Sequence, residues 1–204
     1  KLKVMLGDYT VLYNADRTDL RLSRPVEMPA GFDWKSLYGQ YLQGREWDKQ
    51  RAWADAEKCY QNCLASDPNY LPALTAMANL MTRSARYQEA LTYATRAISI
   101  DTYDAAANFI YGVVNARLKK YTDAIDGFSI ASAALEYRAA SYVEMSKLFL
   151  LQNQPGRAKE YAMKAAVTNP MEVPAFELLA VIARLQSDQM AADKALAQLE
   201  ALDP

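Results

Sequence analysis

Residues 71–104 read LPALTAMANLMTRSARYQEALTYATRAISIDTYD, and this stretch decides the fold. Apolar residues at helical spacing mark its two halves, first as Leu74, Met77, Ala78 and Met81, then as Ala90, Leu91, Ala94, Ala97 and Ile98. Apolar side chains three or four positions apart lie on one face of an α-helix, so each half predicts an amphipathic helix. The polar residues 83–86 leave room only for a tight turn. The stretch therefore predicts two helices packed side by side.

The same pattern recurs along the chain with a fixed period. Alanine stands at positions 56, 90, 124, 158 and 192, each 34 residues after the one before. Twelve positions before each of them lies another small residue, in the order Gly44, Ala78, Gly112, Ser146 and Ala180. Two helices approach to about 8–10 Å only where the side chains between them are small. A fixed period of about 20–50 residues indicates stacked repeats, so each unit is expected to be one helix pair.

The period divides most of the chain into five units. Their expected bounds are 37–70, 71–104, 105–138, 139–172 and 173–204. A single helix pair cannot bury its apolar face, whereas stacked pairs bury a continuous core. The sequence therefore predicts a solenoid in which each unit contacts only its neighbours.

These columns resemble a known family. The matching positions are Gly44 and Gly112, the five alanines, Tyr60 and Phe128, and Asp67-Pro68. Over about four fifths of the chain they resemble the tetratricopeptide repeat (TPR) family. The resemblance implies an all-α, right-handed superhelical solenoid of about five helix–turn–helix repeats. It also implies a role in protein interaction rather than catalysis.

Residues 1–36 fall outside the period. Lys1–Leu6 and Tyr9–Tyr13 alternate as short strands do, and Leu20–Arg24 has the pattern of a third. So small a piece cannot hold a core by itself. We expect a β-prone segment, either the tail of an upstream β-rich domain or a linker, with a disordered leader as the alternative. Asp33 is expected to cap the first helix.

A narrower resemblance rests on the junction and on the third unit. The residues that carry it are Arg24-Pro25, Asp33-Trp34, Tyr38-Gly39, Ala56-Glu57, and the stretches 48–51, 99–108, 111–112 and 126–129. They resemble the C-terminal part of large bacterial proteins in which a β-rich domain called DUF5107 precedes TPR units. The resemblance implies that the chain is the repeat region of a larger bacterial protein with a link to carbohydrate processing. The chemistry would lie upstream, and no catalytic residue of that family falls on a position here.

Composition narrows the function classes. Lys and Arg number 23 against 24 Asp and Glu, a net charge of -1 that argues against a nucleic-acid or membrane-surface binder. No apolar run reaches the roughly 18 residues of a membrane span. The absence of histidine removes Ser-His-Asp and Cys-His catalysis, and no glycine-rich phosphate loop occurs. The sequence therefore predicts no enzyme, no catalytic residue and no cofactor.

The two cysteines have a structural and a chemical interpretation. Cys59 and Cys63 lie four positions apart on one predicted helix, which is poor geometry for a disulfide. A zinc site needs two further ligands, and the chain has no histidine to supply them. Cys63 also occupies a column of small residues seven positions after the repeated alanine, with Ala97, Ala131 and Ala165. We expect Cys63 to be a core residue, and no metal site.

The TPR resemblance also implies where a partner binds, because the first helix of each TPR unit lines a concave groove. The expected groove residues are Tyr38, Tyr41, Arg45, Thr75, Asn79, Phe109, Val113, Val143 and Lys147. Exposed together, Phe109, Val113 and Val143 would form an apolar patch typical of an interface. The alternative is that these three residues are covered within the chain.

One binding mode of the family is testable in the sequence. Chaperone-binding members grip a C-terminal carboxylate with two lysines, two asparagines and an arginine. The corresponding positions carry Tyr41, Arg45, Ala76, Ala106 and Ile110, and one unit later Thr75, Asn79, Ile110, Ala140 and Glu144. Neither set is basic enough, so we expect no carboxylate-clamp binding to chaperones.

The expected function is a protein-interaction scaffold in the C-terminal region of a larger bacterial protein. Its partner would be a protein or peptide, or an upstream domain of the same chain. Two alternatives stay open. One is a free-standing adaptor that binds a peptide in the groove. The other is an accessory region of a glycan-processing protein, with Trp34, Tyr38 and Tyr41 as the residues to test.

Overall fold

A computed structural model describes residues 2–6, 9–13 and 31–202 of the chain. The chain divides into two compact units, Lys1–Asp33 and Trp34–Pro204. The boundary falls close to residue 37, where the repeat period was expected to begin.

The first unit contains a β-hairpin. β1 (Leu2–Leu6) pairs antiparallel with β2 (Tyr9–Tyr13), with Leu2 opposite Tyr13. The two strands predicted at these positions are therefore confirmed. The third predicted strand, Leu20–Arg24, lies outside the described residues.

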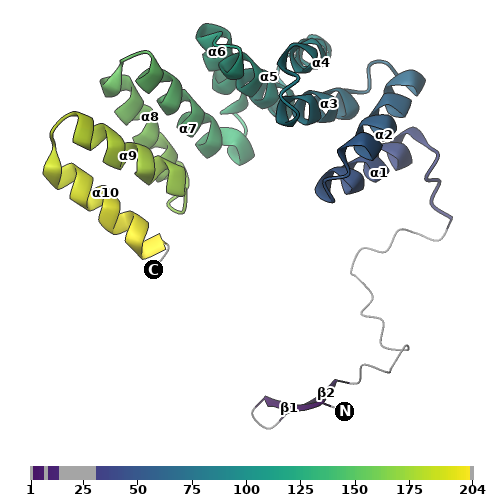
Figure 1. Cartoon of the computed structure of the whole chain (residues 1–204), viewed down its shortest axis with the longest axis horizontal. Helices are drawn as coiled ribbons and strands as arrows, with labels where there is room; N and C mark the ends of the chain where they lie inside the picture. The colour runs from purple at the N-terminus through teal and green to yellow at the C-terminus, as the bar shows by residue number, and fades with distance from the viewer. Residues whose placement is uncertain (1, 7–8, 14–30, 203–204) are drawn as a thin grey trace. The chain divides into compact units, whose positions relative to one another are not determined.

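The second unit consists, as far as it is described, of ten α-helices in five pairs (Figure 1). They are α1 (Leu37–Lys49) with α2 (Trp53–Ser66), α3 (Leu71–Arg83) with α4 (Tyr87–Ile100), α5 (Ala105–Arg117) with α6 (Tyr121–Ala131), α7 (Leu135–Leu151) with α8 (Pro155–Thr168), and α9 (Val173–Leu185) with α10 (Gln189–Leu202). The all-α solenoid predicted from the sequence is confirmed.

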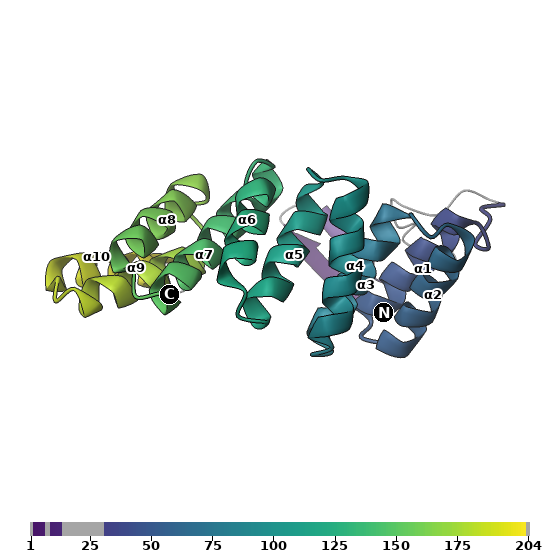
Figure 2. The ribbon, with the colours of Figure 1, turned by 90° about the horizontal axis from the view of Figure 1, so that it is seen from above.

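The helix pairs lie side by side in chain order, as Figure 2 shows. Each first helix packs on its own second helix, and α1, α3, α5 and α7 also contact the first helix of the next pair. The helices α1, α3, α5, α7 and α9 therefore form one layer of the solenoid. This layer carries the expected groove.

The repeated small residues lie where the helices cross. All five column alanines, Ala56, Ala90, Ala124, Ala158 and Ala192, are 0% exposed. A Cβ added at Gly44 would lie 2.5 Å from the Tyr60 ring, and one at Gly112 would lie 2.8 Å from the Phe128 ring. Real Cβ atoms essentially never come so close, so these two positions need glycine. The aromatic ring of the second helix fills the space that the glycine of the first helix leaves.

Stacking makes the core continuous from pair to pair. Val114 of α5 packs in a cluster with Met77 and Leu80 of α3. Phe109, on the same helix, packs against a second cluster that contains Phe128 and extends to α9. Because α5 contributes to both clusters, the apolar core continues through it from one helix pair to the next.

Every turn inside a pair contains a residue in the left-handed conformation. These residues are Arg51, Ala85, Lys119, Asn153 and Ser187, with φ of 61°, 57°, 60°, 56° and 58°. The next residue donates its N–H to the carbonyl five positions back, as in the 2.9 Å bond from Arg86 to Met81. This pattern is a helix C-cap at which glycine is the usual residue. None of the five is glycine, so each turn carries backbone strain.

Turns between pairs are closed by a side chain that accepts a backbone hydrogen bond. At one site this acceptor is missing, and there the next helix begins earlier. Asp67, Asp101 and Asn169 each accept a hydrogen bond from the N–H two residues on, at 2.9, 2.9 and 3.1 Å. The third position of this column, between Asp101 and Asn169, is Leu135, which has no side-chain acceptor. There α7 begins at Leu135, earlier than the expected boundary at 139. Arg138 fixes the joint by donating to the carbonyls of Ser132 and Ala133 at 2.9 and 2.7 Å.

The cap of the first helix corrects another expectation. The N-cap of α1 is Ser36, whose Oγ accepts the N–H of Gly39 at 3.0 Å, and not Asp33.

Among the helices that the structure describes, none combines the length and apolar character needed to cross a bilayer.

Candidate functional site

A hollow of about 710 Å³ lies on the layer of first helices. Its lining comes from α1, α3 and α5, from the start of α7, and from Tyr60 of α2 and the α5 cap Asp104. The lining residues are Tyr41, Arg45, Asp48, Lys49, Tyr60, Leu71, Pro72, Thr75, Ala76, Asn79, Asp104, Ala106, Phe109, Ile110 and Tyr137. The helices expected to line a groove therefore do enclose a concave surface.

Several of the expected groove residues meet in this hollow. They are Tyr41, Arg45, Thr75, Asn79 and Phe109. Tyr41, Thr75 and Phe109 occupy the same position in the first three pairs, and Arg45 and Asn79 occupy the position four residues later. The period brings them together because α1, α3 and α5 run side by side.

The remaining expected residues lie elsewhere, and Val143 is a correction. Val143 is 3% exposed and packs with Ala165 of α8 and Ala175 of α9, so it belongs to the core. Val113 is half-buried against the core cluster around Phe128. The expected apolar patch of Phe109, Val113 and Val143 therefore does not form, because neighbouring helices cover two of its members.

Tyr38 and Lys147 lie on the surface away from the hollow lining. Tyr38 is 55% exposed on the first turn of α1. Lys147 is exposed on α7 and forms an ion pair with Glu144 at 2.7 Å.

Aromatic rings stand on two sides of the hollow. On the α1 side, the Tyr41 ring meets the edge of Tyr70 at a centroid distance of 5.7 Å. On the other side, the rings of Phe109 and Tyr137 lie 5.4 Å apart. Burial raises the pKa of both tyrosines that line these walls, Tyr41 and Tyr137, so both phenols stay protonated and neutral. Between the walls lie small residues of α3 and α5, including Ala76 and Ala106.

Tyr137 was missed by the reasoning from sequence. The period assigned it to the end of the third unit, where it would follow the last helix of that unit. In the structure it lies in the first turn of α7, because that helix begins at Leu135. The signal was available, since Leu135 stands where the other unit boundaries have Asp or Asn.

The charged residues around the hollow differ in whether they have a partner of opposite charge within the chain. Asp48 forms an ion pair with Arg83 on α3, and Asp104 accepts the N–H of Ala107 at 2.7 Å as the cap of α5. Arg45 is exposed, and its guanidinium lies 6.0 Å from the centroid of the Tyr41 ring. The lining thus carries two carboxylates that are engaged within the chain and two cations, Arg45 and Lys49, both on α1.

The carboxylate-clamp positions also fall in the hollow. Tyr41, Arg45, Ala76, Ala106 and Ile110 all belong to its lining. Only Arg45 among them is charged. The positions therefore correspond to those of the carboxylate clamp in chaperone-binding members, but the side chains at them differ. The absence of chaperone-tail binding stays a prediction.

Cys63 has the environment expected of a core residue, whereas Cys59 is partly exposed. Cys63 is 0% exposed, and its Sγ lies 3.5 Å from the carbonyl oxygen of Leu37. Burial raises the pKa of the Cys63 thiol to about 11. Across residues 2–6, 9–13 and 31–202, no group of three or more acidic, cysteine or histidine side chains could hold a metal ion.

Solved structures share this fold at low sequence identity. The chain is similar to PilF of Pseudomonas aeruginosa at a TM-score of 0.77 and 18% identity, over 82% of this chain and 77% of that one. It is similar to MamA of Desulfovibrio magneticus RS-1 at 0.72 and 17%, over 84% and 96%. It is similar to YrrB, described as a TPR protein with an unusual peptide-binding site, at 0.65 and 14%, over 83% and 88%. At these identities the likeness shows the TPR-type fold alone.

A family model gives a sequence-level match. No curated protein matches the chain significantly. The model of the TT21 fifth ARM repeats domain matches residues 47–150, about half of the chain. The matched region runs from the end of α1 to the end of α7 and so includes most of the hollow. The chain belongs to this family of helical repeat domains.

Proposed function

We propose that this chain is a protein-interaction scaffold that binds a short segment of a partner protein in the hollow on its first-helix layer. The observation that carries the proposal is the hollow itself, of about 710 Å³ with aromatic rings on two sides. Ligand sites in proteins typically measure about 300–1,000 Å³ and combine apolar walls with a few polar groups. The lining of this hollow has that composition.

The peptide class of ligand is supported by the lining and by a neighbour. Arg45 and Asn79 offer polar groups at equivalent positions of the adjacent helices α1 and α3, an arrangement that suits a chain segment. YrrB, one of the structures similar to this chain, is described as having a peptide-binding site. A groove between helices is a recurrent way of binding a segment of another protein.

The scaffold has no catalytic role in this proposal. Its charged and aromatic groups serve recognition, and the partner segment belongs to another protein or to an upstream domain of the same chain. The DUF5107 resemblance supports a position for the scaffold in the C-terminal region of a larger bacterial protein. The free-standing adaptor and the accessory region of a glycan-processing protein remain the alternatives to that placement.

The test uses random peptides of about ten residues, displayed on phage and selected on the intact chain. A photo-crosslinking amino acid is then placed at Asn79, inside the hollow, or at Thr92 on α4. Thr92 is the matched control because it lines a separate hollow of about 520 Å³ on the second-helix side. We expect selected peptides to crosslink from position 79 and not from position 92. Crosslinking from 92 alone, or a selection that returns no peptide, would contradict the proposal.

A further inference from the structure

We propose that the hollow recognises a segment in which an acidic side chain stands next to an aromatic one. Arg45 and Asn79 receive the carboxylate, and the Phe109–Tyr137 wall receives the ring. This inference rests on the proposed function and names the chemistry of its partner. It predicts selectivity that a general peptide groove would not show.

The acidic part of the inference follows from which charged residues of the lining have partners within the chain. The Asp48 carboxylate is neutralised by Arg83, and the Asp104 carboxylate is held by the backbone of α5. Arg45 has no carboxylate partner within residues 31–202, and it occupies the same position on α1 that Asn79 occupies on α3. A cation beside an amide donor is a receptor for a carboxylate, because both groups donate hydrogen bonds and the cation adds charge.

Lys49 adds a second positive charge on the same side of the hollow as Arg45. It lies one helical turn after Arg45 and also lines the hollow. Its only ion pair in the described part of the chain is with Glu46 at 3.8 Å, between two largely exposed side chains. Such a pair holds the lysine weakly. On the α1 side of the hollow a partner carboxylate therefore meets two cations, and the carboxylate that α1 itself contributes, Asp48, is paired with Arg83.

The aromatic half of the inference follows from the early start of α7. The extra turn at Leu135 brings Tyr137 against Phe109, whose other neighbour is the Phe128 ring at 5.5 Å. Aromatic rings attract one another at centroid distances of about 4.5–7 Å in edge or offset arrangements. The lining that α3 and α5 contribute includes two small side chains, Ala76 and Ala106, beside larger ones such as Ile110. A ring of the partner therefore has space beside Phe109 and Tyr137 and a surface that suits it.

The site is also short. Its lining residues run from Tyr41 to Tyr137, and beyond them Val143 is buried in the core. On the next turn of α7, Lys147 is paired with Glu144. The recognised segment is thus a few residues long and does not follow the whole solenoid.

The experiment measures fluorescence anisotropy with four dye-labelled peptides on the intact chain. All have the same Gly-Ser flanks, an acetylated N-terminus and an amidated C-terminus, so that only the centre differs. The centres are Glu-Phe-Glu, Gln-Phe-Gln, Lys-Phe-Lys and Glu-Ala-Glu. We expect Glu-Phe-Glu to bind about tenfold more tightly than each of the others at low salt. The preference for Glu over Gln should shrink as salt is added, because rim charges are screened.

Two variants assign the preference to named residues. Arg45→Glu should reverse the order of the Glu and Lys peptides, whereas Arg184→Glu, an exposed arginine on α9, should leave it unchanged. Tyr137→Ala should remove the preference for Phe over Ala, whereas Tyr87→Ala, a half-buried tyrosine on α4, should retain it. Helicity measured by circular dichroism confirms that each variant is folded. Because Arg45 is exposed, its charge reversal leaves the fold intact even if Tyr137→Ala does not.

The outcomes separate this inference from the proposed function. Equal binding of the Glu, Gln and Lys peptides would overturn the charge half, and an unchanged Phe preference in folded Tyr137→Ala would overturn the aromatic half. Failure of all four peptides, while display-selected peptides still crosslink from position 79, would overturn the inference and leave the proposed function standing. Failure of both experiments would overturn both.

Discussion

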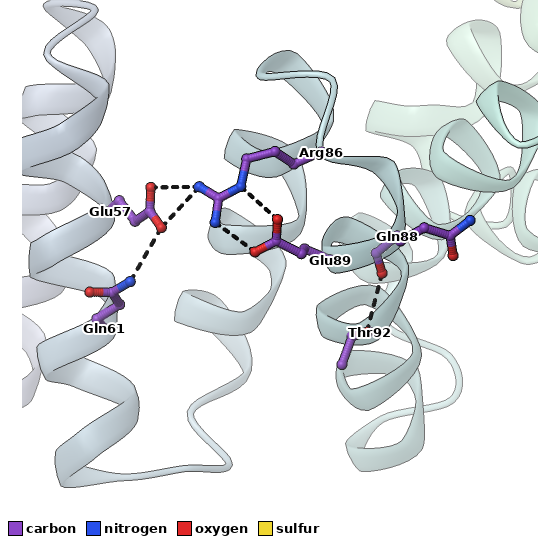
Figure 3. A network of polar contacts seen from close by, with 6 residues as sticks. All are labelled: Glu57, Gln61, Arg86, Gln88, Glu89 and Thr92. Carbon is purple, nitrogen blue, oxygen red and sulfur yellow. Dashed lines mark hydrogen bonds and ion pairs between the residues drawn. The ribbon is translucent and has the colours of Figure 1, made fainter.

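Arg86 joins Glu57 across the seam between the first two helix pairs, as Figure 3 shows. Its Nη1 donates to both Glu57 carboxylate oxygens at 3.1 and 2.9 Å, while its Nε and Nη2 donate to Glu89 at 2.8 and 2.6 Å. Gln61 adds a bond of 3.2 Å to Glu57. One guanidinium from the α3–α4 turn thus ties α2 to the start of α4.

This network predicts a small contribution to the free energy of unfolding that is lost at acid pH. The hydrogen bond from Arg86 lowers the pKa of Glu89. A carboxylate with a lowered folded-state pKa stabilises the fold above its unfolded pKa, and this contribution is lost as pH falls through the folded value. We expect urea midpoints of Glu89→Gln and wild type to differ slightly at neutral pH and to converge in acid. Exposed ion pairs contribute little, so a large loss at neutral pH would contradict this account.

The left-handed turn residues predict an opposite response to one substitution at two sites. Ala85 has a φ of 57° and is exposed, so Ala85→Gly should raise the free energy of unfolding by about 0.5–1 kcal/mol. Ala65 is also exposed but lies within α2, and Ala65→Gly should lower it by up to about 1 kcal/mol. Urea unfolding followed by circular dichroism measures both. A loss of stability in Ala85→Gly would show that the turn is not strained.

The helix crossings predict a second matched pair. A Cβ at Gly112 would lie 2.8 Å from the Phe128 ring and 3.1 Å from the Ala124 carbonyl, so Gly112→Ala should cost about 1–3 kcal/mol. Gly156, in the first turn of α8, has no atom within 4 Å of the same position. There Gly156→Ala should stabilise the chain by about 0.5–1 kcal/mol. Equal thermal midpoints for the two variants would refute the close crossing of α5 and α6.

The buried thiol predicts a response to alkaline pH. Burial raises the pKa of Cys63 to about 11, above the ordinary thiol value. The stabilisation from keeping this thiol neutral is complete below the unfolded pKa and is lost as pH rises through the folded one. We expect the wild type to lose stability between pH about 9 and 11 more steeply than Cys63→Ala. A thiol reagent at mildly alkaline pH should modify Cys59 before Cys63, since only Cys59 is partly exposed.

The sequence predicted the fold well because the helix crossings leave little freedom. A 34-residue period fixes which residues meet between helices, and the columns of Ala56 and Cys63 are buried as expected. The period also brings Tyr41, Thr75 and Phe109 together in the lining of the hollow, and their role in binding stays a prediction. Both results have one cause, which is that regular repeats place equivalent residues in equivalent surroundings.

The sequence failed where one unit departs from the period. Leu135 has no side-chain acceptor, so α7 begins early, and Tyr137 enters the hollow. Val143 has the same position in the period as Tyr41 and Phe109, but it packs against Ala165 and Ala175 and is buried. The left-handed residues, such as Ala85, also gave no signal, because the turn imposes a conformation that its sequence does not favour.

The early start of α7 has a consequence for redesign of the chain as a modular array. The helices of the first three pairs keep one 34-residue phase, so an extra 34-residue module inserted between α2 and α3 continues the array in register. A module inserted between α6 and α7 meets a joint held by Arg138 and not by an acidic or amide side chain. It would detach Tyr137 from Phe109 while leaving every regular crossing in place. Insertion between α2 and α3 would likewise separate Arg45 from Asn79, so the two junctions divide the hollow at different places, one at its polar side and the other at its aromatic wall.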